Sequence, residues 1–159
     1  MSTKETPLWE LLERGGIYYS LNGNSIQEVL NELVKIIKAG EPIHREELLT
    51  AILEREALMS TSIGKAIAIP HPRNPIISLE EDQFTAMAFL GNPVDWNALD
   101  GQKVDTLILT LSASAKSHLK TLSAISFFCR QEDFIKLLKE RASREAIISY
   151  IKDTEQTWK

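Results

Sequence analysis

The sequence predicts an α/β fold, a three-layer αβα sandwich with a central β-sheet between layers of helices. Helix-like and strand-like segments are mixed along the chain, which is the first indication of this class. The second is that the strand-like segments at 84–90 and 104–111 consist almost wholly of apolar or small residues, as expected of strands covered on both faces. No repeat, low-complexity tract or linker interrupts the pattern, so residues 1–159 are expected to form one domain.

A short helix and a strand open the predicted fold. Residues 8–14 favour a helix that ends at the glycine pair 15–16. The sequence IYYSL at 17–21 is rich in β-branched and aromatic residues and is predicted to be a strand. The turn residues Asn-Gly-Asn at 22–24 close it.

Two longer helices are predicted next. Ser25 and Glu28 have the spacing of a capping box, which opens a helix, and Gly40 and Pro42 are expected to end it. A second helix is expected at 45–58. The apolar residues expected to face inward are Ile26, Val29, Leu30, Leu33, Val34 and Ile37 in the first helix and Leu48, Leu49, Ile52 and Leu53 in the second.

The second half of the chain alternates strands and helices. The sequence KAIAIPHPRNP at 65–75 is predicted to be a short strand leading into a proline-marked loop, and the two apolar strands follow it. The remaining predicted helices span residues 115–130, 133–140 and 144–153. In the first of these, one apolar stripe is expected to hold Leu119, Leu122, Ile125, Ser126 and Cys129.

Charge and composition exclude several classes of protein. The chain has 18 basic and 22 acidic residues, a net charge of −4, and they are interspersed. A nucleic-acid partner is not expected, because such proteins usually carry a basic stripe. The single cysteine, Cys129, cannot form an internal disulfide and suits a reducing compartment. We see neither a secretory leader nor an apolar run long enough to insert into a membrane, so a cytoplasmic protein is expected.

The sequence lacks the motifs of several common sites. No group of Cys and His residues has zinc-binding spacing, so no metal is expected. Neither a Gly-x-Gly-x-x-Gly nor a Walker-type loop is present, so no nucleotide cofactor is expected. A Gly-x-Ser-x-Gly nucleophile elbow is also missing.

His71 is the first candidate for chemistry. It lies between Pro70 and Pro72, and each proline pushes the residue before it towards extended geometry. The imidazole is therefore expected on a stiff backbone just beyond the end of a buried strand, where ligand sites of α/β sheets commonly lie. Arg73, two residues further in an extended chain, would point to the same side and meet an anion there. The alternative is an incidental surface histidine in a proline-rich loop.

The other two histidines differ in context. If Ser114 caps the helix that follows, His118 lies just after its first turn, where the helix dipole favours an anion and disfavours imidazolium. The local pattern alone favours a helix-surface histidine over a site residue. His44, beside Arg45, is interpreted as a solvated residue at a helix start.

The segment from Arg45 to His71 resembles a known family. It contains R-E-x-x-x-S-T-x-I-G-x-x-I-A-I-P-H, ending at His71, which is similar to the pattern of the enzyme IIA domain of the fructose–mannitol class of the bacterial phosphotransferase system. The nitrogen-regulatory branch is the most similar. His118-Leu119 and Asp133-Phe134 also fit the family, and the resemblance extends over about residues 8–148. It implies a mixed sheet of about five strands.

The resemblance also implies roles for individual residues. His71 matches the histidine that is phosphorylated, and His118 matches a second histidine packed beside it. Arg55 matches the arginine that helps to bind the phosphoryl group, and Ser60 and Thr61 belong to the same pocket. The expected donor is a histidine-phosphorylated carrier protein, and the acceptor is a regulatory target protein or an enzyme IIB.

Three features depart from the family pattern. Ser62 stands where glycine is usual, which raises the question of whether the backbone there needs a positive φ. Lys65 stands where a small, polar or acidic residue is common, and Pro72-Arg73 replaces a more usual glycine.

The predicted function is therefore that of a phosphohistidine carrier of the phosphotransferase system, of the regulatory type. One alternative is a sugar-uptake enzyme IIA that passes the group to an enzyme IIB. The other is a binding module that has lost phosphoryl transfer. The intact set of His71, His118 and Arg55 argues against the loss, and the lack of a permease segment favours regulation over transport.

Overall fold

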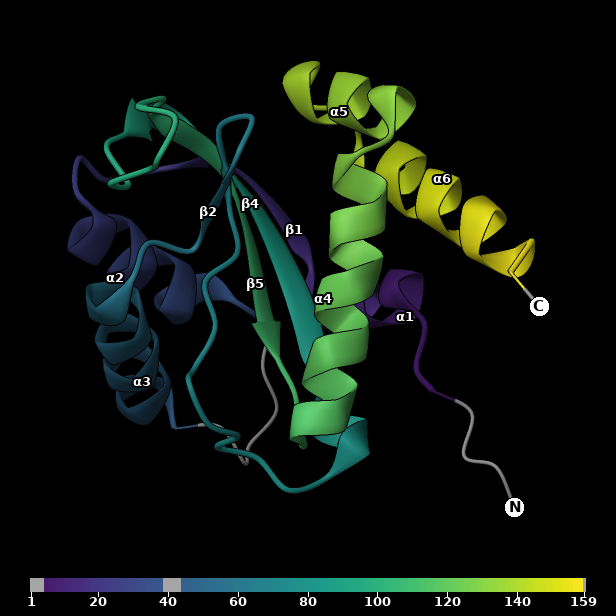
Figure 1. The fold of residues 1–159 in the computed structure, drawn as a ribbon, viewed down its shortest axis with the longest axis horizontal. Helices are drawn as coiled ribbons and strands as arrows, with labels where there is room; N and C mark the ends of the chain where they lie inside the picture. Colours follow the sequence, from purple (N-terminus) through teal and green to yellow (C-terminus); the bar gives the residue numbers. More distant parts are fainter. Residues whose placement is uncertain (1–4, 39–43, 159) are drawn as a thin grey trace.

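A computed structural model describes residues 5–38 and 44–158 of the chain. In this part, one sheet lies between two helical layers (Figure 1). The helices are α1 (Leu8–Gly15), α2 (Ile26–Ile36), α3 (Arg45–Leu58), α4 (Ala115–Cys129), α5 (Glu132–Lys139) and α6 (Arg144–Gln156). The strands are β1 (Ile17–Leu21), β2 (Ser62–Gly64), β3 (Ile67–Ala68), β4 (Phe84–Val94) and β5 (Val104–Leu111), and a one-turn 3₁₀ helix spans Glu80–Asp82.

The sheet is mixed and has five strands in the order β1-β4-β5-β3-β2. The β1–β4 and β3–β5 pairs are parallel, whereas the β4–β5 and β2–β3 pairs are antiparallel. The α/β class and the mixed five-stranded sheet are confirmed. Every strand predicted from the sequence is present, and β2 was not predicted.

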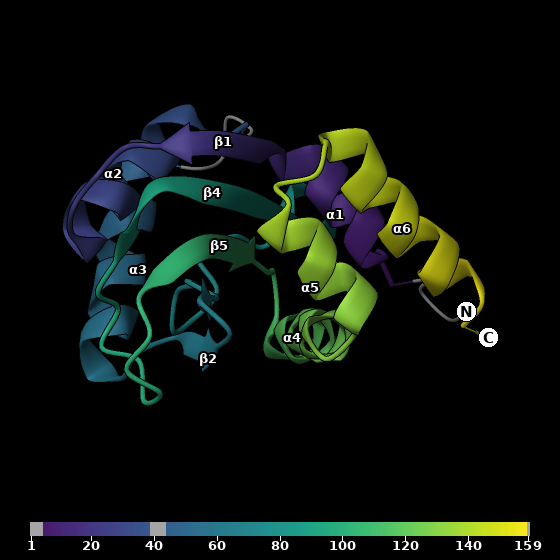
Figure 2. The ribbon, with the colours of Figure 1, turned by 90° about the horizontal axis from the view of Figure 1, so that it is seen from above.

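Each face of the sheet builds its own core. In Figure 2, α2 and α3 cover one face, and α1, α4, α5 and α6 cover the other. Side chains alternate along β5, so that Leu107 and Leu109 pack towards α2 and α3 while Ile108 packs towards the other layer. The same alternation places Ala88 and Met87 of β4 in different cores. Both central strands are therefore covered on both faces, as their composition predicts.

A capping box defines the start of α2. Ser25 Oγ accepts a hydrogen bond from the Glu28 amide at 3.1 Å, while Glu28 Oε1 accepts one from the Asn24 amide at 3.0 Å. The predicted capping box is present, although its return bond reaches one residue further back than usual. Helix α2 ends at Ile36, and the predicted stop signals Gly40 and Pro42 lie outside the described residues.

The predicted apolar stripe of α4 is wrong at two positions. Leu119 is 66% exposed and Ser126 is exposed, whereas Thr121 and Phe128 are buried beside the predicted Ile125 and Cys129. The helix therefore packs a different face on the sheet. The predicted stripe and the observed buried stripe of α4 both contain apolar residues at helical spacing. The spacing alone could therefore not identify the buried face.

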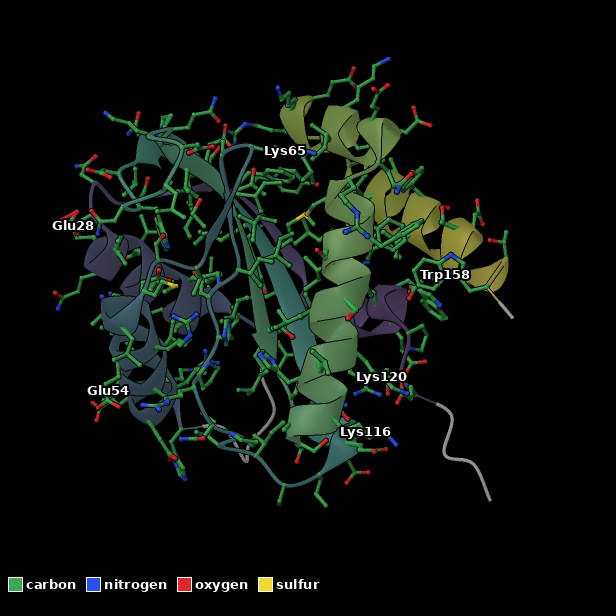
Figure 3. All side chains as sticks on the ribbon, viewed as in Figure 1. Glu28, Glu54, Lys65, Lys116, Lys120 and Trp158 are labelled. Carbon is green, nitrogen blue, oxygen red and sulfur yellow. The ribbon has the colours of Figure 1, made fainter. Side chains whose placement is uncertain are left out.

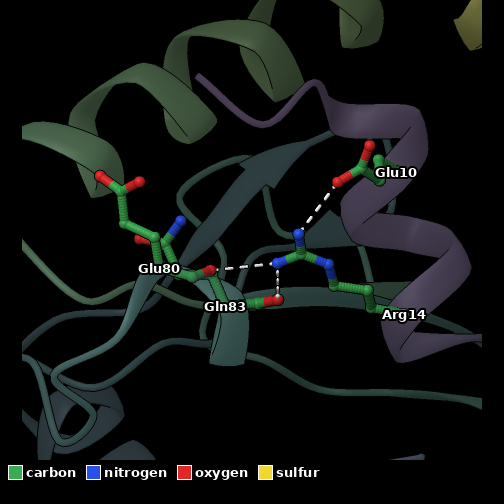
Figure 4. Close-up of polar contacts among 4 residues, drawn as sticks. All are labelled: Glu10, Arg14, Glu80 and Gln83. Atoms are coloured by element: carbon green, nitrogen blue, oxygen red, sulfur yellow. Dashed lines mark hydrogen bonds and ion pairs between the residues drawn. The ribbon is translucent and has the colours of Figure 1, made fainter. Parts of the chain in front are cut away.

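Arg14 attaches α1 to the segment before β4 (Figure 4). Its Nη1 donates to the carbonyl oxygens of Glu80 at 3.1 Å and Gln83 at 2.9 Å, and its Nη2 contacts Glu10 Oε2 at 2.9 Å. Gln83 Oε1 in turn accepts from the amide of Ala113, just before α4, at 2.8 Å. These bonds fix the start of α4 relative to the sheet.

None of the helices in the described ranges has the length and apolar character of a membrane span.

Strands β2 and β3 form a tight hairpin with a strained turn. Gly64 pairs with Ile67, so Lys65 and Ala66 form a two-residue loop. Their φ angles are 57° and 64°, the positive values of a type I′ turn, which favours Asn and Gly. An L-residue in this left-handed conformation costs about 1–2 kcal/mol.

Replacing Ala66 by Gly is expected to stabilise the protein by about 1 kcal/mol, because the positive φ no longer opposes a Cβ atom. Chemical denaturation of both proteins measures the difference. Ala51→Gly, in the middle of α3, is the matched control and should destabilise by about 1 kcal/mol. A loss of stability in Ala66→Gly would show that the turn is not strained.

Candidate functional site

Two backbone hydrogen bonds hold the segment that carries His71. The amide of Ile69, just beyond β3, donates to the carbonyl of Thr61 at 3.0 Å. The carbonyl of Pro70 accepts from the amide of Thr110 in β5 at 3.1 Å. His71 is thus fixed between the residue before β2 and a central strand, and its side chain is half-buried. The prediction that it follows the end of a buried strand on a stiff backbone agrees with this geometry.

The imidazole of His71 has a defined tautomer. Its Nδ1 lies 2.8 Å from the carbonyl oxygen of Ile69. A carbonyl oxygen only accepts hydrogen bonds, so Nδ1 carries the proton in the neutral ring. The lone pair is therefore on Nε2, which is the nitrogen able to act as a nucleophile or ligand.

His118 lies beside His71. The hydroxyl of Ser114 caps α4 by accepting from the Ser117 amide at 3.1 Å, as predicted, and His118 follows in the next turn. The two imidazole centroids are 4.7 Å apart and the rings are inclined by 46°. The structure therefore brings together the two histidines that lie 47 residues apart in the chain.

Both imidazoles are shifted towards the neutral form. Burial is the main cause that lowers the pKa of His71, and Arg55 lowers it further, while the bond to Ile69 and the charge of Glu56 raise it. Burial also lowers the pKa of His118 to about 4, with further contributions from His71 and Arg55. At neutral pH the site thus contains two uncharged rings beside one guanidinium.

Arg55 is the cation of the site. It lies in the last turn of α3, where its Nη1 donates to the carbonyl of Met59 at 2.7 Å. This bond holds the side chain over the end of its own helix, and its charge acts on both His71 and His118. The structure therefore brings the charge of Arg55 within electrostatic range of both predicted histidines.

The hydroxyls of Ser60 and Thr61 already have protein acceptors. Ser60 Oγ donates to the carbonyl of Trp96 at 2.6 Å, and Thr61 Oγ1 donates to Glu56 Oε1 at 2.6 Å. The Thr61 amide donates to Glu56 Oε2 at 2.7 Å. Their expected role in phosphate binding stays a prediction, since each hydroxyl would need to exchange its present partner.

Arg73 shares a cavity with His118. This cavity of about 330 Å³ is lined by residues of the loop after His71, the end of β5 and the start of α4, among them Pro72, Arg73, Thr110, His118 and Leu119. Arg73 is exposed at its edge, so an anion or a partner at His118 would meet it.

The described residues contain no cluster of three or more His, Cys, Asp or Glu side chains placed to hold a metal ion.

The family departures fit the backbone in different ways. Ser62 lies in β2 and is not among the described residues with positive φ, so serine is unstrained there. Lys65 does adopt a positive φ, and its Nζ donates to the carbonyl of Cys129 at the end of α4 at 2.9 Å. Cys129 is buried, which raises the pKa of its thiol to about 12 and agrees with the core role predicted for it.

Sequence reasoning assigned no role to Glu56. It is the second residue of the R-E pair in the recognised pattern, and its position beside Arg55 was the available signal. A glutamate in an amphipathic helix is usually solvated, so the sequence alone gave no reason to expect it buried.

Comparisons with known proteins now identify the family. Residues 10–154 match the family model described as "Phosphoenolpyruvate-dependent sugar phosphotransferase system, EIIA 2". The chain belongs to this family. It is 35% identical over 148 residues to a "Nitrogen regulatory protein" of Bradyrhizobium diazoefficiens, covering 91% of this chain and 92% of that protein.

Two further relatives extend the comparison. The chain is 33% identical over 150 residues to the "PTS system fructose-specific EIIABC component" of Bacillus subtilis, covering 89% of this chain but 22% of that protein. The crystal structure of nitrogen regulatory protein IIA-Ntr from Neisseria meningitidis has a TM-score of 0.74 at 23% identity, covering 85% of this chain and 92% of that chain. This likeness confirms the fold. The family is one of phosphotransferase components, in agreement with the predicted class.

Replacing Arg55 by Gln is expected to raise the pKa of both His71 and His118, because the guanidinium opposes protonation of each ring. Histidine ring signals followed by NMR during a pH titration measure both values. Lys116→Gln is the control: it removes a cation two residues from His118 on a different side of α4 and should leave both titrations unchanged. Unaltered titrations in Arg55→Gln would contradict the described geometry.

Proposed function

We propose that this chain is a regulatory phosphoryl carrier, a single enzyme IIA domain that accepts a phosphoryl group on Nε2 of His71. The observation that carries the proposal is the bond from His71 Nδ1 to Ile69, which leaves Nε2 unprotonated beside a second neutral imidazole. The donor would be a histidine-phosphorylated carrier protein, and transfer would take place in the cytoplasm without metal or cofactor. Membership of the phosphotransferase family supports this chemistry.

The transfer step needs only the two histidines that exchange the group. The Nε2 lone pair of His71 attacks phosphorus, and the electron pair of the breaking P–N bond returns to the donor imidazole. The proton on Nδ1 of His71 stays in place, so the phosphorylated ring bears positive charge that the Ile69 carbonyl faces. Such transfer depends on positioning and charge neutralisation.

The remaining site residues would stabilise the transferring group. Arg55 supplies positive charge next to both rings. A neutral His118 can donate one hydrogen bond to a phosphoryl oxygen without adding the cost of a second cation. We propose that Ser60, Thr61 and Arg73 complete the phosphate pocket, with Arg73 at the exposed edge where a partner approaches.

His71→Ala is expected to abolish a mass gain of one acid-labile, base-stable phosphoryl group after incubation with phosphoenolpyruvate and the general phosphotransferase proteins. Intact-mass measurement detects it, and His44→Ala, at the exposed start of α3, should label like the parent. The pKa of His71 in the folded protein lies below the ordinary 6.5. The labelling rate of the parent should therefore fall only at a pH below 6.5, where the ring becomes protonated. Undiminished labelling of His71→Ala would refute the assignment.

His118→Ala is expected to label on His71 at a rate reduced on the order of a hundredfold, the usual effect of removing one preorganised donor. Time-resolved mass measurement gives the rate, and peptide mapping gives the site. Stable phosphate on His118 of the parent protein would instead assign the acceptor role to that residue.

The regulatory role rests on the similarity to nitrogen regulatory proteins over nearly their whole length. Phosphorylation adds close to two negative charges near His118, whose exposed neighbour Leu119 lines the same cavity. A partner that buries apolar surface there would be disfavoured, and one that presents arginine would be favoured. The similarity to a fructose-specific component supports the alternative acceptor, an enzyme IIB.

The two phosphorylation states are expected to bind a target protein with affinities that differ by tenfold or more, which needs only about 1.4 kcal/mol. Pull-downs from extract with the parent, His71→Ala and the His71→Asp mimic compare the states. If the three recover the same proteins, while a membrane extract containing permeases rapidly discharges the phosphorylated form, the sugar-uptake function replaces the regulatory one.

A further inference from the structure

Glu56 is a carboxylate in an unfavourable place. It is 9% exposed and lies in the last turn of α3, near the negative end of the helix dipole. Burying a charge there is costly unless the protein compensates for the lost water. In the described ranges, no Lys or Arg forms an ion pair with it. An apolar residue at this position would avoid the cost, so the retained charge calls for an explanation.

Both oxygens of this carboxylate bind the same residue. Oε2 accepts from the Thr61 amide at 2.7 Å and Oε1 accepts from the Thr61 hydroxyl at 2.6 Å. Thr61 therefore has a fixed position between the end of α3 and the start of β2. It uses both of its donors on Glu56, and its carbonyl oxygen remains to accept from elsewhere.

The Thr61 carbonyl connects this pair to His71. It accepts the Ile69 amide at 3.0 Å, and the Ile69 carbonyl accepts His71 Nδ1 at 2.8 Å. Three consecutive contacts thus lead from a buried carboxylate to the imidazole: Glu56 to Thr61, Thr61 to Ile69, and Ile69 to His71. The charge of Glu56 also reaches the ring directly, since it opposes the effect of Arg55 on the pKa of His71.

We propose that Glu56 is a positioning residue of the phosphoryl-transfer site, which orients His71 through Thr61 and Ile69 and stabilises the positive charge that its ring acquires. The inference rests on the proposed function for the transfer step. Its logic resembles that of a carboxylate which orients a histidine and stabilises the imidazolium, except that two backbone carbonyls stand between the charge and the ring. The arrangement also explains the buried charge, because a glutamine of the same shape could accept from only one of the two Thr61 donors and would lose the negative charge.

Glu56→Gln is the decisive variant, because the amide keeps the shape and removes the charge. We expect it to lower the pKa of His71 in the unphosphorylated protein and to slow labelling by about 10- to 100-fold, by analogy with the loss of a group that orients a metal-bound histidine. Glu54→Gln is the matched control: it removes a carboxylate from the exposed side of the same helix (Figure 3) and should change neither quantity. Glu56→Asp, which keeps the charge, should restore part of the rate.

Thermal unfolding followed by circular dichroism establishes that each variant is folded. A merely structural role for Glu56 would lower the melting temperature and leave the pKa of His71 where it was. If folded Glu56→Gln labels at the parent rate with an unchanged His71 titration, the inference is overturned. If the parent itself does not label, the proposed function fails instead, and the titration still tests the coupling of Glu56 to His71.

The parent protein offers a measurement that needs no variant. Nitrogen-15 chemical shifts distinguish protonated from unprotonated ring nitrogens, and at neutral pH His71 must show the proton on Nδ1. A proton on Nε2 would break the last contact of the chain and overturn the inference even if Glu56→Gln does not fold. The carrier function would survive that outcome, with phosphate attached to the other nitrogen.

Discussion

The hydrogen bond between His71 Nδ1 and the carbonyl of Ile69 is the interaction on which the site depends. It selects one tautomer, and it also orients the ring, because the carbonyl belongs to a backbone segment that is itself bonded to Thr61 and Thr110. A histidine on an isolated proline-rich loop would sample several rotamers and both tautomers. Here the prolines limit the backbone and the sheet supplies the acceptor, so the nucleophilic nitrogen is defined before any partner binds.

The charges around the pair of imidazoles are balanced against each other. Burial and Arg55 favour neutral rings. The nucleophile requires a neutral ring, and a neutral second imidazole still donates one hydrogen bond. The same guanidinium would oppose the positive charge that a phosphorylated ring carries, and Glu56 lies buried in the next position of α3. One helix end therefore delivers both a cation that suits the phosphoryl oxygens and an anion that suits the imidazole. Adjacent residues of a helix point about 100° apart, so the two groups approach the site from different sides.

Local features of the fold could be predicted from the sequence, whereas long-range ones could not. Ser25 and Ser114 act on amides three residues away, so their spacing reveals two helix starts. Strand β2 has three residues and pairs with a strand of two, too few for any periodicity to emerge. The family resemblance gave His118 its place beside His71, since the chain pattern alone favoured a surface residue. The burial of Glu56 depends on Thr61, five residues away across a helix end, and no spacing rule covers that contact.

The position of α4 decides whether the two imidazoles meet, and the structure fixes that helix at both ends. At its start, Gln83 accepts the Ala113 amide, and Arg14 anchors the backbone of Gln83 in turn. At its end, Lys65 donates to the carbonyl of Cys129, where a cation also suits the negative end of the helix dipole. Lys65 reaches that carbonyl from a turn in which it and Ala66 both adopt positive φ. The strain in the hairpin is thus tied to the placement of α4, because a lysine side chain at this point of the turn holds the helix that carries His118.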